Sequence, residues 1–153
     1  MWQDYLFLTQ SNQVKIQKSM SQKVIYSPEA PEPIGPYSQA IQAGHLLFVS
    51  GQIAIQKSTG QIQLANIEAE TTQVMENIGA ILKAAGLDFS NVVKCSIFLK
   101  DMGNFPRVND VYGRYFKQNP PARETVEVSR LPKDVNVEIS CIAQAFDVLP
   151  HHK

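Results

Sequence analysis

The strongest constraint on this chain is one apolar stripe over residues 67–85, which lies between segments with a two-residue period. Apolar and small residues recur there every three or four positions, as on one face of an α-helix. The stripe consists of Ile67, Thr71, Val74, Ile78, Ile81 and Ala85, with Leu82 beside it. Asn66 is suited to cap the start of this helix, and Gly86 is suited to end it. The sequence therefore predicts a helix over residues 67–85 with a single face to bury.

The segments around this helix favour strands. The clearest is 135–146, where Val135, Val137, Ile139, Cys141 and Ala143 alternate with residues that are polar except for Ile142. Further strands are predicted at 23–27, 37–44, 45–53, 91–100 and 123–131, and in 91–100 one face should hold Val93, Cys95, Ile97 and Leu99. A second helix is predicted over 105–117, with a stripe formed by Phe105, Val108, Val111, Tyr112, Tyr115 and Phe116. The element order is β-β-β-α-β-α-β-β, which indicates an α+β fold.

Both helix connections are expected to be right-handed crossovers, which would place both helices on one face of a six-stranded sheet. Runs such as "LLFV" (46–49) and Phe98 would leave apolar side chains on the other face. An uncovered apolar face favours association, so we expect a homo-oligomer that packs these faces together.

The length of 153 residues fits a single domain. We predict that this domain spans residues 20–148, after an extension at 1–19 that is disordered or precedes the native start, and before a tail at 149–153. Lys and Arg total 14, as do Asp and Glu, so charge argues against a nucleic-acid partner. No apolar run approaches the roughly 20 residues that a membrane helix needs. The two cysteines, Cys95 and Cys141, are predicted to be buried free thiols in a reducing compartment, and a cytoplasmic protein is expected.

One arginine is held unusually firmly by its neighbours. In "NPPARETVEV" (119–128), two prolines restrict the approach to Arg123, and a strand restricts the chain after it. An arginine restrained in this way has lost part of its entropy before a ligand arrives, and its planar fork suits a carboxylate. A solvated arginine at a strand edge, paired with an acidic residue, is the alternative reading.

A carboxylate is expected near this arginine. Arg123 and Thr125 share one face of their strand, and a short turn at "LPKD" (131–134) should pair that strand with the one that carries Glu138. Glu138 would then lie within a few residues of Arg123, either as a structural ion-pair partner or as a base that orients water. His45, His151 and His152 do not form a metal-binding group, so no metal site is predicted.

Several motifs in order resemble one known family. They are "IGPYSQA", "FVSGQI", "NIGAILKAAG", "VVKCSIFLKDM", "FPRVNDVYGRYF" and "PPARETVEVSRLPKDVNVEIS", and together they cover about residues 21–146. The chain resembles the Rid family of reactive-intermediate deaminases, also called the YjgF family, and in particular its RidA subgroup.

The resemblance implies a chorismate-mutase-like fold in a homotrimeric barrel, with ligand sites in clefts between subunits. It also implies hydrolysis of 2-imino acids such as 2-iminobutanoate and 2-iminopropanoate, which pyridoxal-phosphate dehydratases release in amino-acid metabolism, with no cofactor and no metal. The products are a 2-oxo acid and ammonia. Two further functions stay open: an endoribonuclease or RNA-binding inhibitor of translation, and a non-catalytic trimer that binds small 2-oxo acids.

The resemblance also implies roles for individual residues. Arg123 would bind the substrate carboxylate, and Glu138 would orient or activate water. Backbone groups near Glu124 and Thr125 would meet the imine nitrogen. The remaining pocket residues implied are Tyr37, which reaches the site from across the subunit interface, Ser50 and Asn109.

Overall fold

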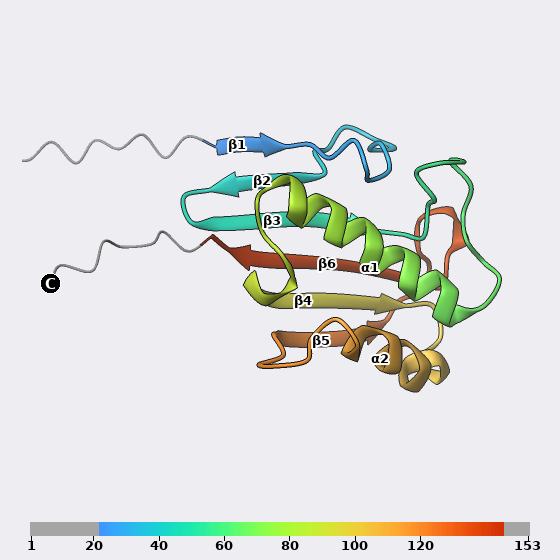
Figure 1. Ribbon diagram of the computed structural model, residues 1–153. Coiled ribbons are helices and arrows are strands. Elements are labelled where there is room, and N and C mark those ends of the chain that lie inside the picture. Colours follow the sequence, from blue (N-terminus) through green and yellow to red (C-terminus); the bar gives the residue numbers. More distant parts are fainter. Residues whose placement is uncertain (1–21, 146–153) are drawn as a thin grey trace, which may run out of the picture.

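The computed structural model describes residues 22–145, which form a six-stranded sheet with two helices on one face (Figure 1). The strands are β1 (Gln22–Ile25), β2 (Ala40–Ala43), β3 (Leu46–Gln52), β4 (Val92–Leu99), β5 (Ala122–Glu127) and β6 (Val137–Gln144). The helices are α1 (Ile67–Ala84) and α2 (Phe105–Gly113). The α+β class and the element order agree with the prediction. The predicted extension at 1–19, the predicted tail at 149–153 and the outermost residues of the predicted domain lie outside the described residues.

The strands are ordered β1-β2-β3-β6-β4-β5 across the sheet. β4 and β5 are parallel and are connected through α2, whereas the other neighbouring strands are antiparallel. The predicted pairing of the last two strands is therefore wrong, because β4 lies between β5 and β6. The crossover through α2 places β5 on the outer side of β4, and the chain then passes through the short 3-10 turn Pro132–Asp134 to the inner side of β4.

Helix α1 follows its sequence signals closely. The side chain of Asn66 accepts a hydrogen bond from the Ala69 amide at 2.8 Å, and Gly86 has a φ of +73°, which glycine adopts without strain. The predicted stripe is buried against the sheet, with Ala85 packed at its end. Helix α2 is shorter than predicted and ends at Gly113. Tyr115 and Phe116 nevertheless pack against the core from the following turn.

The main core lies between the helices and the facing side of the sheet. In β6 the inward residues are Val137, Ile139, Cys141 and Ala143, as the alternation predicts. In β4 the prediction is wrong at one end, because Val92 faces inward while Val93 is 41% exposed. A register shift between Val92 and Lys94 inserts an extra residue opposite β6, which reverses the alternation there.

The two cysteines are free, buried and directly opposite each other on β4 and β6. Burial raises the pKa of both Cys95 and Cys141, which keeps them as neutral thiols. This confirms the prediction of buried free thiols.

Neither helix of residues 22–145 covers the second face of the sheet. Phe48 on β3 and Val126 on β5 are 43% and 40% exposed there, although both are large apolar side chains. This open face is the uncovered surface that the sequence predicts. Within residues 22–145, none of the helices is long and apolar enough to cross a membrane.

Candidate functional site

Arg123 lies at the start of β5 against one face of α2. Its guanidinium carbon is 5.5 Å from the centre of the Phe105 ring and 5.0 Å from that of Tyr112, and its Nη1 donates a hydrogen bond to Asn109 Oδ1 at 2.7 Å. Phe105, Asn109 and Tyr112 are spaced at i, i+4 and i+7, so α2 presents all three on one face. Contacts of a guanidinium with aromatic faces are attractive. Arg123 is thus held by α2, and its other side-chain N–H groups have no acceptor in the described part of the chain.

A second polar atom near Arg123 lacks a partner. Thr125 follows two residues later on the same face of β5, and its Oγ1 is buried without a hydrogen-bond partner among the described residues. Buried hydroxyl groups are nearly always hydrogen-bonded, so an unsatisfied one beside a restrained arginine indicates a place for a ligand or water. We call Arg123, Asn109 and Thr125, with the rings of Phe105 and Tyr112, the arginine group.

The side chain of Glu124 does not join this group. It lies on the open face, where its carboxylate accepts hydrogen bonds from Ser96 Oγ and from Lys94 Nζ, the latter at 3.0 Å. These two contacts lower the pKa of Glu124. Only the backbone of Glu124, which lies between Arg123 and Thr125 in β5, is therefore next to the arginine group.

Glu138 lies in a different hollow, on the open face of β6. The hollow has a volume of about 400 Å³ and is lined by Ile34, Tyr37, Ser50, Gly51, Ile53, Pro132 and Glu138, which we call the glutamate pocket. Glu138 is half-buried, and burial raises its pKa. Among residues 22–145 its carboxylate has no hydrogen-bond partner. A carboxyl group in this environment suits proton transfer more than structural pairing.

A glycine makes room for this carboxylate. A Cβ atom built on Gly51 would lie only 1.9 Å from Glu138 Oε1, so no larger residue fits while Glu138 keeps its place. Gly51 lies where the pairing of β3 with β6 shifts register between Val49 and Gln52. The register shift in β3 and the lack of a side chain on Gly51 together leave the space that the Glu138 carboxylate occupies.

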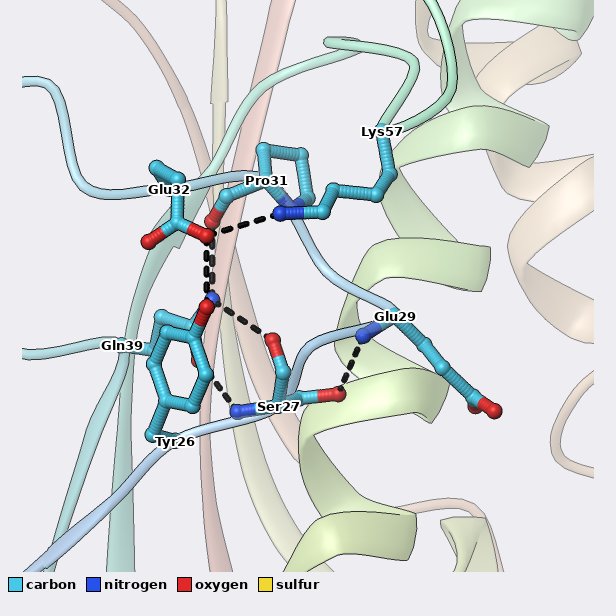
Figure 2. A network of polar contacts seen from close by, with 7 residues as sticks. All are labelled: Tyr26, Ser27, Glu29, Pro31, Glu32, Gln39 and Lys57. Carbon is cyan, nitrogen blue, oxygen red and sulfur yellow. Dashed lines mark hydrogen bonds and ion pairs between the residues drawn. The ribbon is translucent and has the colours of Figure 1, made fainter.

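The loop that carries Tyr37 is fixed by a buried glutamine (Figure 2). Gln39 is 2% exposed, and its Oε1 accepts a hydrogen bond from the Ser27 amide at 2.6 Å. Its Nε2 donates to the carbonyl oxygens of Ser27 at 3.2 Å and of Pro31 at 2.8 Å. Tyr26 and Lys57 both donate to Glu32 in the same loop, at 2.6 and 2.7 Å (Figure 2).

Ser50 also holds this loop. Its hydroxyl donates to the Ser38 carbonyl at 2.7 Å, next to Tyr37 in the chain. The Tyr37 hydroxyl in turn accepts a hydrogen bond from the Ile34 amide at 3.3 Å. The Tyr37 side chain is therefore presented at the rim of the glutamate pocket by a loop with several anchors.

Six of the seven side chains predicted for the site thus fall into two groups on opposite sides of the sheet. Arg123, Asn109 and Thr125 belong to the arginine group, and Tyr37, Ser50 and Glu138 line the glutamate pocket. The side chain of Glu124 belongs to neither group. Arg123 pairs with Cys95, whose side chain faces the helices, whereas Glu138 pairs with Phe98 on the open face. The prediction that Glu138 lies near Arg123 in one chain is wrong, because β4 separates their strands and the sheet separates their side chains. Three features were not predicted from the sequence: Gly51, Pro132 and the stacking of Phe105 and Tyr112 on Arg123. The i, i+4, i+7 spacing in "FPRVNDVYG" is the signal that could have revealed the stacking.

Comparison with known proteins places the chain in a family. The family model described as "Endoribonuclease L-PSP" matches residues 27–145. A RutC family protein of Pyrococcus horikoshii is 54% identical over 79% of this chain and 96% of its own length. The chloroplastic Reactive Intermediate Deaminase A of Arabidopsis thaliana is 44% identical over 82% of this chain and 67% of its own length.

Solved structures agree with these relatives. A Rid family protein from Yersinia pestis superimposes with a TM-score of 0.80 and 47% identity, covering 82% of this chain and all of that one (100%). Escherichia coli TdcF with bound serine has a TM-score of 0.78 and 38% identity, covering 81% and 99% of the two chains. The chain therefore belongs to the Rid family, which the endoribonuclease L-PSP model describes, and has the YjgF/RidA fold.

Proposed function

We propose that this protein hydrolyses 2-imino acids, such as 2-iminobutanoate and 2-iminopropanoate, to 2-oxo acids and ammonia. The observation that carries the proposal is the restrained guanidinium of Arg123, which has donors left for a ligand and a buried, unsatisfied Thr125 hydroxyl beside it. A planar fork held in this way suits the carboxylate end of a small acid. The Arabidopsis relative is named a reactive intermediate deaminase, which supports the reaction class.

The second part of the proposal is that the active site is shared between two copies of the chain. The arginine group and the glutamate pocket lie on opposite sides of one sheet, so a single chain cannot apply both to one small molecule. The open face carries exposed apolar side chains that a second copy would cover. In the assembly that we propose, a homotrimer, the arginine group of one copy meets Glu138 and Tyr37 of the next.

The chemistry then needs few groups. Arg123 holds the substrate carboxylate, which places the adjacent C=N carbon near Glu138. Glu138 accepts a proton from a water molecule as the water oxygen bonds to that carbon, and the imine nitrogen takes up a proton. In the resulting carbinolamine Glu138 gives the proton that it took from water to the nitrogen, and the hydroxyl proton passes to solvent in exchange for the one that the imine nitrogen took up. The C=O bond forms as the C–N bond breaks, and ammonia leaves. One water is consumed, no electrons are transferred, and the half-buried state of Glu138 suits it to both proton transfers.

The proposal is tested by a coupled assay. A threonine or serine dehydratase generates the imine, and the rate of imine disappearance is followed with wild-type protein, Arg123→Ala and Glu138→Gln. Wild-type protein should accelerate imine loss with release of 2-oxo acid and ammonia, and both variants should lose most of this effect. Acceleration that is unchanged in Arg123→Ala would overturn the assignment.

A non-catalytic role as a binder of small carboxylates is the second candidate, and one comparison favours it. The structure of Escherichia coli TdcF contains bound serine, which is a small α-carboxylate. This candidate predicts that pyruvate or serine binds in a way that depends on Arg123, while the imine decays at its uncatalysed rate. The same assay, combined with calorimetric titration of pyruvate, separates the two functions.

A further inference from the structure

Helix α1 buries three polar side chains in its apolar face: Glu70, Thr71 and Asn77 are 1%, 0% and 2% exposed. Burying a charged or amide side chain is costly unless it finds partners, and apolar residues would fill the same space at lower cost. Thr71 satisfies its hydroxyl within the helix, on the Ile67 carbonyl at 2.7 Å. Glu70 and Asn77 instead bind segments outside the helix.

Glu70 binds the residue that precedes β6. Its Oε1 accepts a hydrogen bond from the Asn136 amide at 2.7 Å, and its Oε2 accepts one from Asn136 Nδ2 at 2.8 Å. The Asn136 carbonyl in turn accepts a hydrogen bond from the Lys100 amide at 3.0 Å. Glu138 follows two residues later, so Glu70 ties the start of its strand to α1.

The segment before Asn136 needs such an anchor. Lys133 and Asp134 have φ values of +56° and +58°, a conformation that residues other than glycine adopt only at a cost. Pro132, at the start of this strained turn, lines the glutamate pocket. A turn of this kind persists where surrounding contacts hold it in place.

Asn77 binds a second segment that lines the pocket. Its Nδ2 donates to the carbonyl oxygens of Ile53 at 3.1 Å and Ile55 at 3.0 Å, just beyond the end of β3. Its Oδ1 accepts a hydrogen bond from Gln73 Nε2 at 3.0 Å. Ile53 lines the glutamate pocket, as Pro132 does, so this contact fixes a second segment of the pocket lining.

We propose that Glu70 and Asn77 are positioning residues that hold the two walls of the glutamate pocket on α1 and so fix the place of the Glu138 carboxylate. The two residues are seven positions apart, which puts them on the same helix face about two turns from each other. One rigid element therefore sets the distance between Asn136 and the Ile53–Ile55 segment. The inference rests on the proposed function for its activity readout.

The test compares truncations with matched controls. Glu70→Ala and Asn77→Ala each remove one anchor. Glu70→Gln keeps both hydrogen bonds if the Asn136 amide group turns over, so that its Oδ1 accepts from the new Nε2. Thr71→Val is equally buried and removes a hydrogen bond within the helix, but it leaves both pocket walls untouched.

We expect Glu70→Ala and Asn77→Ala to lower kcat for imine hydrolysis roughly tenfold or more, since small displacements of a catalytic group have effects of this size. KM should change little, because the hydrogen bonds of both residues go to Asn136 and to the Ile53–Ile55 segment and not to the arginine group. Glu70→Gln should retain activity within about threefold, and Thr71→Val should retain it despite a comparable loss of melting temperature. Equal loss of kcat in Thr71→Val and in both truncations would show that these residues serve stability alone and would overturn the inference.

A second readout does not require catalysis. The titration of the Glu138 carboxyl is followed by carbon NMR in an Arg123→Ala background, so that no arginine of a second copy contributes. Tyr37 is then the other titratable side chain among the described pocket residues. A loosened pocket admits water, so the raised pKa of Glu138 should fall towards its ordinary value in both truncations and stay unchanged in Glu70→Gln and Thr71→Val. If wild-type protein fails to hydrolyse imines, the proposed function is wrong, and this titration still decides the positioning role: an unchanged pKa in both truncations refutes it.

Discussion

Arg123 and Glu138 lie on opposite faces of the same sheet, on the two strands that flank β4. Their partners on β4 are Cys95 and Phe98, three residues apart along the strand. At about 3.3 Å per residue this offset alone is about 10 Å, before the width of β4 and the thickness of the sheet are added. Any reaction that uses both side chains must therefore bring together two copies of the chain.

The most direct check of a shared site is to mix two inactive variants. Arg123→Ala retains an intact Glu138, and Glu138→Gln retains an intact Arg123. If the two are unfolded together and refolded in equal amounts, about a quarter of the interfaces in a random trimer combine both intact residues. Imine hydrolysis should recover to about that fraction of the wild-type rate. If the mixture is as inactive as its components, the site is not shared: either both residues act within one chain, or one of them is not part of the site.

Replacement of Arg123 should separate charge from shape. We expect Arg123→Ala to lower kcat/KM about a hundredfold or more, because hydrogen bonds to charged groups contribute about 1.5–3 kcal/mol each. Arg123→Lys keeps the charge but loses the planar fork, so its kcat/KM should lie between those of the alanine variant and wild type. Arg114 offers a control, since it is an exposed arginine at the end of α2, and Arg114→Ala should leave imine hydrolysis unchanged.

The pKa of Glu138 should report the neighbouring copy. In one chain burial raises this pKa, because the charged form is desolvated. In the proposed assembly a nearby Arg123 favours the carboxylate and lowers the pKa. Arg123→Ala should therefore raise the pKa of Glu138 above its wild-type value, measured by carbon NMR. An identical titration in both proteins would mean that the guanidinium does not approach Glu138.

The same titration has a consequence for stability. A carboxyl whose pKa is higher in the folded state than in the unfolded state favours folding at low pH and opposes it as pH rises through the folded pKa. In the Arg123→Ala background, Glu138→Gln should therefore raise the melting temperature, and this increase should be larger at pH 7 than at pH 4. A gain that is the same at both pH values would show that charge burial is not its cause.

Gly51→Ala tests whether the Glu138 carboxylate must occupy the space beside Gly51. The added Cβ would collide with Glu138 Oε1 at 1.9 Å, so the carboxylate must move away. We expect kcat to fall roughly tenfold or more while the protein stays folded and assembled. Gly113→Ala is the matched control, because a Cβ there meets no atom of residues 22–145 within 4 Å. If Gly51→Ala keeps full activity, the position of the Glu138 carboxylate beside Gly51 is not its catalytic position.

Thiol chemistry should play no part in turnover. Cys95 and Cys141 are buried, and burial raises the pKa of both, so neither forms a thiolate readily at neutral pH. Treatment of the folded protein with iodoacetamide should leave imine hydrolysis unchanged, with mass spectrometry showing unmodified cysteines. Rapid inactivation accompanied by alkylation of Cys95 would contradict this expectation.

Local signals in the chain predicted the elements well. Asn66 and Gly86 bound helix α1 as expected, and the stripe from Ile67 to Leu82 is buried. These features depend on hydrogen bonds and contacts within a few residues, so their pattern can be read along the chain. The error at Val93 arose because a bulge depends on the partner strand, which the alternation within β4 cannot show.

The residues of the candidate site were recognisable from family motifs, but their arrangement was not. Whether β5 pairs with β6 depends on whether β4 lies between them, and competition between segments distant in the chain decides this. The buried anchors Glu70 and Asn77 look like ordinary polar positions of a helix, since only their contacts with Asn136, Ile53 and Ile55 distinguish them. Contacts between residues close together in the chain thus determined the helices and strands. Packing between distant segments set the strand order, held Arg123 against α2 and put Arg123 and Glu138 on opposite sides of the sheet.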